Sequence, residues 1–226
     1  MLPVSATVAV AIMAKAPRPG EVKTRLCPPL LPSEAAALYR SFLLDKIASV
    51  GALVDAQPVI AYTPDDARAE FADLAPGFSL VAQQGPDLGA RLHSTLAGLL
   101  TDGCAGAIAV DSDTPTLPGA FLQQAVHCLS RPGPDVVLGP TEDGGYYLIG
   151  MRRAHPELFD AMPWSTPDVF DVTLHRAAMI GLRVTCLAPW FDVDTPEDLD
   201  RLRTILGADT ATPASQTRRL LASWSR

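Results

Sequence analysis

Two short segments of the sequence pair aspartates one residue apart, each where a strand is expected to end. They are Asp111-Ser112-Asp113 and Asp192-Val193-Asp194. Carboxylate oxygens are the ligands that Mg²⁺ or Mn²⁺ prefers, especially when the ion also carries nucleotide phosphates. The four aspartates therefore predict a metal site. A turn with Asx capping is the alternative for the first segment, and a helix cap for the second. Because alternate residues of an extended segment face opposite ways, we expect one of Asp192 and Asp194 to be a ligand.

A basic loop follows the first apolar run. Residues 14–26 read Ala-Lys-Ala-Pro-Arg-Pro-Gly-Glu-Val-Lys-Thr-Arg-Leu. Lys and Arg donors on a loop stiffened by proline can surround phosphate groups at a small rotamer cost. The loop lacks the G-x-x-x-x-G-K-[ST] pattern of a P-loop, so side chains would bind phosphate alongside backbone amides. A solvated basic loop is the alternative. The predicted phosphate ligands are Lys15, Arg18, Lys23 and Arg25.

A second candidate nucleotide segment joins the third expected strand to a helix. Residues 83–92 read Gln-Gln-Gly-Pro-Asp-Leu-Gly-Ala-Arg-Leu. Its glycines allow a ligand to approach the backbone, and a helix start with a nearby arginine favours an anion. Taken alone this segment carries a weak signal. The residues predicted to contact nucleotide are Gln84, Gly85, Gly89 and Arg91.

An acidic, glycine-bearing segment lies between two further expected strands. Residues 139–147 read Gly-Pro-Thr-Glu-Asp-Gly-Gly-Tyr-Tyr and place two carboxylates beside accessible backbone. A sugar or another acceptor could bind there, whereas a plain hairpin turn would explain the glycines but not Glu142. Trp164, within Pro-Trp-Ser-Thr-Pro, either lines an acceptor pocket or packs as a helix-entry staple. The predicted acceptor residues are Glu142, Asp143, Gly144, Gly145 and Trp164.

The elements that must position these segments follow a regular order. Short β-branched runs alternate with amphipathic segments of helix length, which is typical of an α/β domain with a mainly parallel sheet. Ligands bind at the carboxyl ends of strands in such sheets, where the polar segments fall. We expect strands over residues 7–13, 58–62, 78–82, 107–110, 135–139, 146–150 and 182–187. We expect helices over residues 33–50, 65–74, 88–100, 118–129, 167–180 and 196–206.

Length and composition limit the function classes. The chain has 226 residues, of which 48% are hydrophobic and 19% charged, which argues for a folded domain over disorder. No apolar run approaches the roughly 20 residues of a transmembrane helix. A net charge of −7 and a pI near 5.0 argue against broad binding to nucleic acid or anionic membranes. We predict one domain over residues 1–206 and a tail over 207–226, frayed or forming a short helix.

The cysteines and the N-terminus bear on the compartment. The four cysteines are far apart and lack metal-ligand spacing, so we expect reduced thiols and a cytoplasmic protein. Ala14-Lys15-Ala16 imitates a signal-peptide cleavage site, but no positive charge precedes the apolar stretch, so export is not expected.

Together and in this order, the motifs resemble the nucleotide-diphospho-sugar transferase superfamily. Lys-Thr-Arg-Leu, Asp-Ser-Asp-x-Pro and Asp-Val-Asp-Thr-Pro-Glu-Asp-Leu are similar to small nucleotidyltransferases such as molybdenum cofactor guanylyltransferase and 2-phospholactate guanylyltransferase. The proline-bearing form of the first loop, Glu-Asp-Gly-Gly-Tyr-Tyr-Leu-Ile-Gly and Pro-Trp-Ser-Thr-Pro resemble a narrower bacterial group labelled as glycosyltransferases. The likeness covers about residues 7–206. It implies a single-domain GT-A (Rossmann-like) three-layer α/β fold with a mixed, mostly parallel sheet.

The resemblance also implies roles for particular residues. Lys15, Lys23 and Arg25 would bind phosphates, Asp113 and one of Asp192 and Asp194 would bind the metal, and residues 84–91 would flank the nucleotide. Glu142, Asp143 and the glycines beside them would face the second substrate. One departure stands out, because the glycine-rich L-A-G-G-x-S-x-R-M-G loop of standard pyrophosphorylases is replaced by Lys-Ala-Pro-Arg-Pro-Gly. The nucleotide base therefore stays open.

Three functions remain after this reading. The first is metal-dependent nucleotidyl transfer from an NTP to a phosphorylated or anionic small molecule with release of pyrophosphate, with Lys23, Arg25 and Asp143 as catalytic residues. The second is glycosyl transfer from an NDP-sugar, with Asp143 or Glu142 as base. The third is a nucleotide-binding module without catalysis. Four carboxylates gathered at two strand ends argue against the third, because such charge is costly without a cation.

Overall fold

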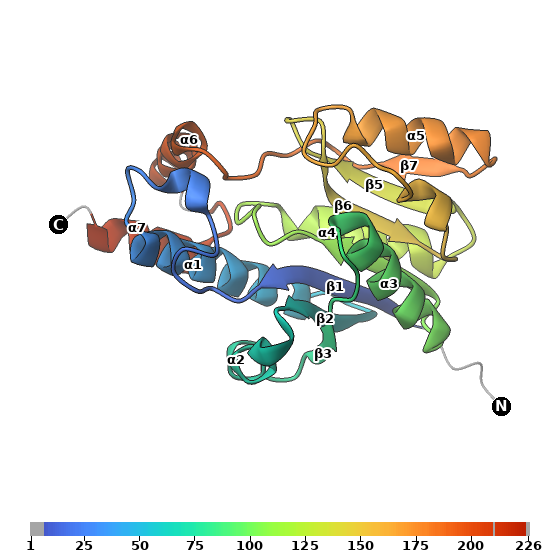
Figure 1. Cartoon of the computed structure of the whole chain (residues 1–226), viewed down its shortest axis with the longest axis horizontal. Helices are drawn as coiled ribbons and strands as arrows, with labels where there is room; N and C mark the ends of the chain where they lie inside the picture. The colour runs from blue at the N-terminus through green and yellow to red at the C-terminus, as the bar shows by residue number, and fades with distance from the viewer. Residues whose placement is uncertain (1–6, 210, 225–226) are drawn as a thin grey trace.

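One sheet organises the part of the chain that the structure describes. The computed structural model describes residues 7–209 and 211–224, where seven strands lie in the order β3-β2-β1-β4-β6-β5-β7 (Figure 1). All neighbours run parallel except β6, which is antiparallel to β4 and β5, so the expected mixed and mostly parallel sheet is confirmed. The strands are β1 (Val8–Lys15), β2 (Ala56–Thr63), β3 (Ser79–Ala82), β4 (Gly106–Val110), β5 (Val136–Pro140), β6 (Tyr146–Met151) and β7 (Val184–Cys186).

Helices cover both faces of this sheet and make the three layers. On β1, the larger side chains Val8, Val10 and Ile12 join one core and the intervening Ala9 and Ala11 join the other, as the two-residue period of a strand requires. The first core packs against α1 (Pro32–Gly51), α2 (Arg68–Leu74) and α4 (Gly119–Ser130). The second packs against α3 (Leu88–Thr101) and α5 (Val169–Met179). Each of the six expected helices is present with small shifts at its ends.

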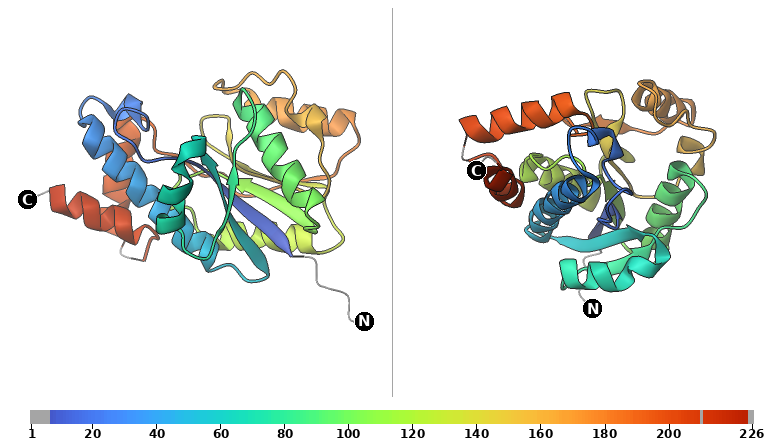
Figure 2. Two further views of the ribbon diagram at one scale, coloured as in Figure 1. Left: turned by 60° about the horizontal axis from the view of Figure 1, so that its bottom comes forward. Right: turned by 60° about the vertical axis from the view of Figure 1, so that its left-hand side comes forward.

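A third apolar cluster joins the end of the chain to its beginning. Leu38 and Phe42 on the outer side of α1 pack in one cluster with Leu202 of α6 (Pro196–Ala208) and Leu221 of α7 (Ser215–Trp224). Figure 2 shows both of these helices beside α1. Within the described part of residues 207–226, the tail therefore forms a short helix packed on α1. Residues 1–6, 210, 225 and 226 lie outside the described residues.

The connections after the strands gather at one edge of the sheet. Short 3₁₀ turns lie in three of the connections, η1 (Thr24–Leu26), η2 (Asp65–Ala67) and η3 (Pro156–Leu158). Because β5 runs parallel to β4, residues 141–145 between β5 and β6 return at the same edge as the Asp111-Ser112-Asp113 turn. All four cysteines are free thiols, as expected. Over residues 7–209 and 211–224, none of the helices has the length and apolar character needed to cross a membrane.

Candidate active site

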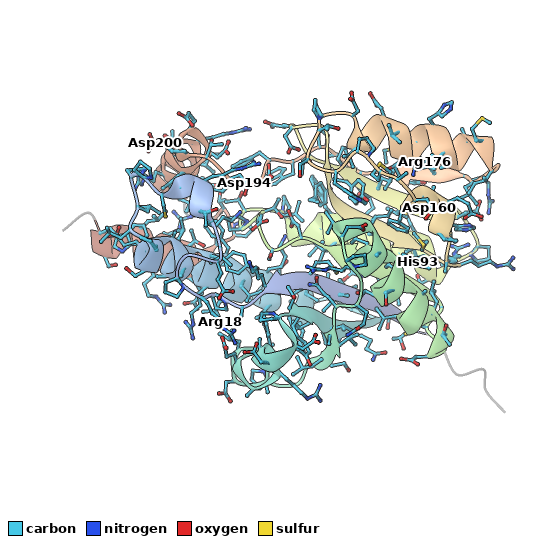
Figure 3. The ribbon with its side chains drawn as sticks, in the orientation of Figure 1. Arg18, His93, Asp160, Arg176, Asp194 and Asp200 are labelled. Atoms are coloured by element: carbon cyan, nitrogen blue, oxygen red, sulfur yellow. The ribbon has the colours of Figure 1, made fainter. Side chains whose placement is uncertain are left out.

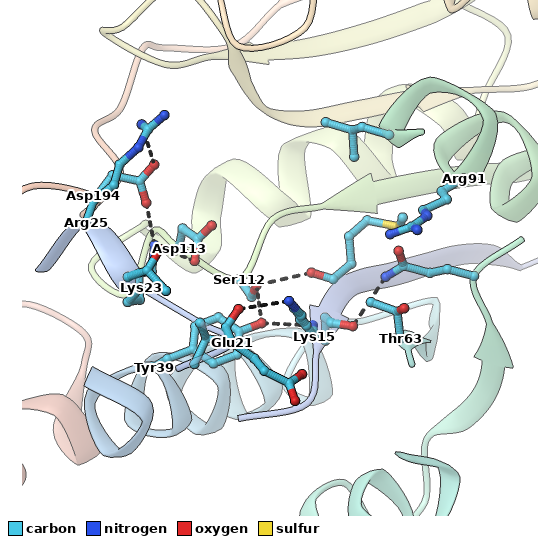
Figure 4. A pocket seen from close by; sticks show the side chains of 16 residues that line it. Lys15, Glu21, Lys23, Arg25, Tyr39, Thr63, Arg91, Ser112, Asp113 and Asp194 are labelled. Carbon is cyan, nitrogen blue, oxygen red and sulfur yellow. Dashed lines mark hydrogen bonds and ion pairs between the residues drawn. The ribbon is translucent and has the colours of Figure 1, made fainter. Parts of the chain in front are cut away.

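Two adjoining cavities open at this edge of the sheet. The first, here called the basic cavity, measures about 390 Å³ and is lined by the loop after β1, the turn after β4 and the start of α3 (Figure 4). The second, the acidic cavity, measures about 400 Å³ and is lined by the 141–145 loop, residues 164–167 and the segment before α6. Arg25, Leu88, Asp113 and Asp194 line both cavities and so form the border between them.

Lys23 stands at this border between two carboxylates. Its Nζ lies 2.7 Å from Asp113 Oδ1 and 2.7 Å from Asp194 Oδ1, and its side chain is 5% exposed. Burial lowers the pKa of the Lys23 ammonium, but the attraction of Asp113 and Asp194 outweighs burial and holds that pKa above its ordinary value. Lys23 also has a left-handed backbone (φ 50°), which turns the chain into η1 and brings Arg25 Nη1 within 3.8 Å of Asp194 Oδ2.

Helix α1 supports the site from below with two buried polar side chains. Lys46 Nζ lies 3.2 Å from Asp111 Oδ1 and donates to Thr114 Oγ1 at 2.6 Å, while Thr114 donates to the same Asp111 oxygen at 2.7 Å. Burial is the main cause that lowers the pKa of Lys46 and raises that of Asp111. Two helical turns earlier, the Tyr39 hydroxyl accepts from the backbone nitrogen of Lys15 at 3.0 Å and lies 2.9 Å from Ser112 Oγ. Burial, with Asp113 nearby, raises the pKa of Tyr39 to about 12.

No role for Tyr39 or Lys46 of α1 was predicted from the sequence. Their signal is the seven-residue spacing, which places Tyr39 and Lys46 on one face of a helix whose neighbouring buried positions are mostly apolar. A lysine on such a face needs a carboxylate partner, because an unpaired buried charge is costly. The sequence therefore indicates that Lys46 forms a buried ion pair, but it does not indicate which carboxylate is its partner.

Two aspartates of the acidic cavity, Asp143 and Asp192, form no ion pair within the described residues. Burial, followed by the charges of Asp143 and Asp194, raises the pKa of Asp192 to about 7. Asp143 Oδ1 accepts from Thr141 Oγ1 at 2.5 Å and from the Gly145 nitrogen at 3.1 Å, which fixes the loop that carries it. Across the cavity, the Tyr146 ring meets Trp164 edge-on with centroids 6.3 Å apart. The Tyr146 hydroxyl is buried without a hydrogen-bond partner in the described part of the chain.

Two predicted acceptor residues hold the loop in place and do not line the cavity. Glu142 forms a two-point ion pair with Arg201 of α6, at 2.5 and 2.9 Å. Gly144 has a φ of +91°, and a Cβ there would lie 2.0 Å from the Pro167 carbonyl oxygen. Glycine is therefore needed at 144 because the loop docks against the 163–167 segment without room for a side chain.

The residues predicted to bind the nucleotide do not all lie in one cavity. Arg18 pairs with Glu70 at 2.5 Å and Asp66 at 3.2 Å, on the side of α2 and away from Asp194 (Figure 3). It lines a third cavity of about 770 Å³, which adjoins the basic cavity at Glu21, Gln83 and Arg91 and also includes Gln84 and Gly85. Gly89 lies under Trp164, because a Cβ there would be 3.0 Å from that ring. The predicted residues that line the basic or acidic cavity are Lys15, Lys23, Arg25, Arg91, Asp111, Asp113, Asp143, Gly145, Trp164, Asp192 and Asp194.

The carboxylates of the border and the acidic cavity suit a hard divalent cation. Their donors are all oxygen, and the raised pKa of Asp192 indicates negative charge that a cation would relieve. As the side chains stand, no three acidic, histidine or cysteine residues within the described ranges form a ready ligand group. Lys23 keeps Asp113 and Asp194 paired with an ammonium, and Lys46 engages Asp111. The predicted metal residues are thus close together, and three of the four, Asp111, Asp113 and Asp194, are paired with lysines.

Comparison with known proteins places this site in a family. Residues 46–166, more than half of the chain, match the model of a family described as "Uncharacterized protein conserved in bacteria (DUF2064)". The chain belongs to this family. The matched range contains Lys46, the turn after β4, the acidic loop and Trp164, whereas the basic loop and the 192–194 segment lie outside it.

Individual relatives agree with this placement. The chain is 29% identical over 189 residues to 2-phospho-L-lactate guanylyltransferase of Methanothermobacter thermautotrophicus, covering 80% of this chain and 78% of the relative. It is 32% identical over 149 residues to phosphoenolpyruvate guanylyltransferase of Rubrobacter xylanophilus, covering 64% and 69%. A crystal structure from Desulfovibrio desulfuricans G20, presented as a nucleotide-diphospho-sugar transferase, has a TM-score of 0.87 and 34% identity, covering 96% and 95%.

These comparisons confirm the superfamily and the GT-A type of α/β fold. The chain is a transferase, since the relatives it matches are named as transferases. The guanylyltransferase relatives support nucleotidyl transfer in general. Lys15, Lys23 and Arg25 of the basic cavity lie outside the range that the family model matches, whereas Arg91 and Asp113 lie inside it.

Proposed function

We propose that the chain transfers a nucleotidyl group from an NTP to an anionic small-molecule acceptor, releasing pyrophosphate, with the help of Mg²⁺ or Mn²⁺. The observation that carries this proposal is the shared border of the two cavities. A triphosphate in the basic cavity would meet an acceptor in the acidic cavity beside Lys23, Arg25 and Asp113.

The residues of the basic cavity supply charge rather than covalent chemistry. An acceptor oxygen attacks the α-phosphorus, the bond to the bridging oxygen breaks, and pyrophosphate leaves with the electron pair. A phosphate or carboxylate nucleophile needs no general base, so positioning and charge neutralisation do the work. We assign phosphate binding to Lys15, Lys23, Arg25 and Arg91, because their side chains line one cavity.

Asp113, Asp192 and Asp194 are the residues that would hold the divalent ion. The ion would neutralise charge on the phosphates. Asp111 is engaged by Lys46 and Thr114, and we assign it the role of positioning the turn that carries Asp113. Arg18 pairs with Asp66 and Glu70 in the cavity that also contains Gln84, Gly85 and Arg91, and its binding of phosphate there stays a proposal.

Glycosyl transfer is the second candidate, and one observation favours it. The acidic cavity presents Asp143 and Asp192 without a paired cation in the described residues, which suits an uncharged hydroxyl acceptor and a carboxylate base. Asp143 is the better base of the two acids in its loop, since Arg201 occupies Glu142 and holds the pKa of that carboxyl below its ordinary value.

Pyrophosphate release separates the two activities. We would incubate the chain with GTP, CTP, UTP or ATP, with Mg²⁺ or Mn²⁺, and with 2-phospholactate or phosphoenolpyruvate as acceptors chosen from the relatives' names. The proposal expects pyrophosphate with one NTP, lost in Asp113→Asn and kept in Asp200→Asn. Asp200 is the matched control because its side chain is 75% exposed and forms an ion pair with Arg203 of the same helix.

Three other results would change the assignment. Thermal stabilisation by NDP-sugars but not by NTPs would favour glycosyl transfer, since a ligand that binds the folded state raises its melting temperature. Nucleotide binding that survives Asp113→Asn without any turnover in the parent chain would favour the non-catalytic module. The absence of any nucleotide effect would contradict the whole assignment.

A further inference from the structure

Lys23 occupies a position that a metal ion would be expected to take. Its Nζ is 2.7 Å from one oxygen of Asp113 and 2.7 Å from one oxygen of Asp194, the two carboxylates at the border of the cavities. Within the described residues, Lys23 is the one side chain that forms an ion pair with Asp113. The Lys23 side chain is 5% exposed, while the Asp113 and Asp194 side chains are 35% and 39% exposed, so the ammonium is buried and the carboxylates face the cavities.

An ammonium and a divalent ion cannot share this place. Both would need the same oxygen lone pairs, and their like charges would repel at close range in a poorly solvated site. The absence of a three-ligand group among the described acidic, histidine and cysteine residues agrees with this exclusion. A divalent ion therefore binds between Asp113 and Asp194 after Lys23 has left them.

The structure also offers Lys23 a place to go. The same side chain lines the basic cavity beside Lys15, Arg25 and Arg91, where nucleotide phosphates would bring several negative charges. A lysine has a flexible four-carbon stem, so its ammonium can change partners through side-chain rotations. Phosphates would compensate the charge that Lys23 loses when it leaves the two aspartates.

We propose that Lys23 is an internal cation that competes with the divalent ion for Asp113 and Asp194 and yields to it when nucleotide phosphates bind. This inference rests on the proposed function, because it assumes that the basic cavity receives a nucleotide. It makes metal and nucleotide binding mutually reinforcing, since each favours the arrangement in which Lys23 has moved.

Titration with Mn²⁺ alone tests the competition directly. Free Mn²⁺ would be measured by electron paramagnetic resonance in the parent chain, in Lys23→Met and in the matched control Lys15→Met. Lys15 lines the same cavity, but its Nζ donates to the backbone oxygen of Glu21 and not to a carboxylate. We expect Lys23→Met to bind Mn²⁺ at least tenfold more tightly than the parent and Lys15→Met to stay within about twofold.

Further variants show which residues bind the ion. A measurement on the unaltered chain gives a result even if a variant does not fold. Adding Asp113→Asn to Lys23→Met should abolish the gain, and Lys23→Gln should reproduce it in a side chain that keeps hydrogen bonding. In the unaltered chain, the ¹³Cε signal of Lys23 should move when Mg²⁺ and nucleotide are added together, and should move less with the same concentration of Mg²⁺ alone. The three measurements use metal binding and spectroscopy, with no readout of activity.

The inference is overturned if Mn²⁺ affinity is unchanged or lower in both Lys23 variants, or if Lys15→Met gains as much. A Lys23 signal that stays in place when Mg²⁺ and nucleotide are added together would also overturn it. The proposed function can fail in these experiments while the competition between Lys23 and the ion is supported. Tighter Mn²⁺ binding by Lys23→Met in a chain that no nucleotide stabilises would support the competition while contradicting nucleotidyl transfer.

Discussion

The ion pair between Lys46 and Asp111 affects the stability of the fold through two single residues. The Lys46 side chain is 2% exposed and the Asp111 side chain 21% exposed, so the ammonium is almost fully removed from water. Desolvation makes such a pair weak evidence for stability, yet removing one partner leaves an uncompensated buried charge. The pair holds the turn after β4 in one orientation. Thr114 accepts a hydrogen bond from Lys46 and donates one to Asp111, so it links both partners.

Lys46→Met should lower the free energy of unfolding by about 3–5 kcal/mol, because it leaves Asp111 without its cation. The double change Lys46→Met with Asp111→Asn should cost less than the single one, since the unpaired charge is gone. Arg40→Met, at an exposed position of the same helix, should change stability by about 0.5 kcal/mol or less. Urea unfolding measures all three. Equal costs for Lys46→Met and Arg40→Met would contradict the buried pair.

At the scale of elements, the acidic cavity exists because two loops dock tightly. The 141–145 loop lies against the 163–167 segment at Gly144, and against α6 through Glu142 and Arg201. Trp164 then closes over Gly89 at the start of α3. The wall of the cavity is therefore built from contacts between glycine backbone and neighbouring segments, which larger residues would prevent.

Gly144→Ala should destabilise the chain by about 2–5 kcal/mol, from its positive φ and from overpacking against Pro167. Gly181→Ala is the matched control, because its φ is +72° but a Cβ there would meet nothing within 4 Å. That change should cost about 1 kcal/mol. Thermal or urea unfolding distinguishes the two, and a cost at 144 no larger than at 181 would show that the loops do not dock as described.

Helix α7 depends on a cap supplied by another helix. Asp45 of α1 accepts from the backbone nitrogens of Gln216 and Thr217, both at 2.9 Å, and from the Thr217 hydroxyl at 2.7 Å. Asp45→Ala should cost about 2 kcal/mol, because it leaves these donors without their acceptor. Hydrogen exchange should show lost protection over residues 215–224 while β1 keeps its protection. Asp45→Asn, which retains an acceptor, should fall in between.

At the scale of the whole molecule, the excess of carboxylates at the site should appear as a pH dependence of folding. The pKa of Asp192 is about 7 in the folded chain against an ordinary value of 3.8. Between these values the folded state holds a proton that the unfolded state has lost, so stability falls as pH rises from about 4 to 7. Above pH 7 the charged Asp192 carboxylate lowers the free energy of unfolding by a constant amount.

Asp192→Asn should remove this dependence. Near pH 4 the variant and the parent should be similarly stable, whereas above pH 7 the variant should be more stable by about 1–2 kcal/mol, allowing for partial solvent screening. Urea unfolding across pH 4–8 measures the difference. A constant difference across that range would mean that Asp192 does not titrate as its surroundings require.

The sequence predicted the elements well because helix and strand periodicities are local. The segments at the strand ends were also predictable, since an α/β sheet gathers them at one edge. Pairings between distant charges were not. Lys23 meets Asp194 across 171 positions and Glu142 meets Arg201 across 59, and nothing near Glu142 in the sequence marks it as an anchor. The ion pairs of Arg18 could not be predicted for the same reason, because Asp66 and Glu70, on η2 and α2, are about fifty positions away.

The distribution of amines has a practical consequence. The chain has three lysines, Lys15, Lys23 and Lys46, and all three lie at the site, while arginine supplies every other strongly basic side chain. Lys15 is exposed, whereas Lys23 and Lys46 are buried. Reagents that acylate primary amines should therefore modify Lys15 before any other side chain of this protein. Dye attached at Lys15, distinguished from dye on the α-amino group by peptide mapping, would thus report on the mouth of the basic cavity, and a ligand bound there would shield Lys15 from labelling.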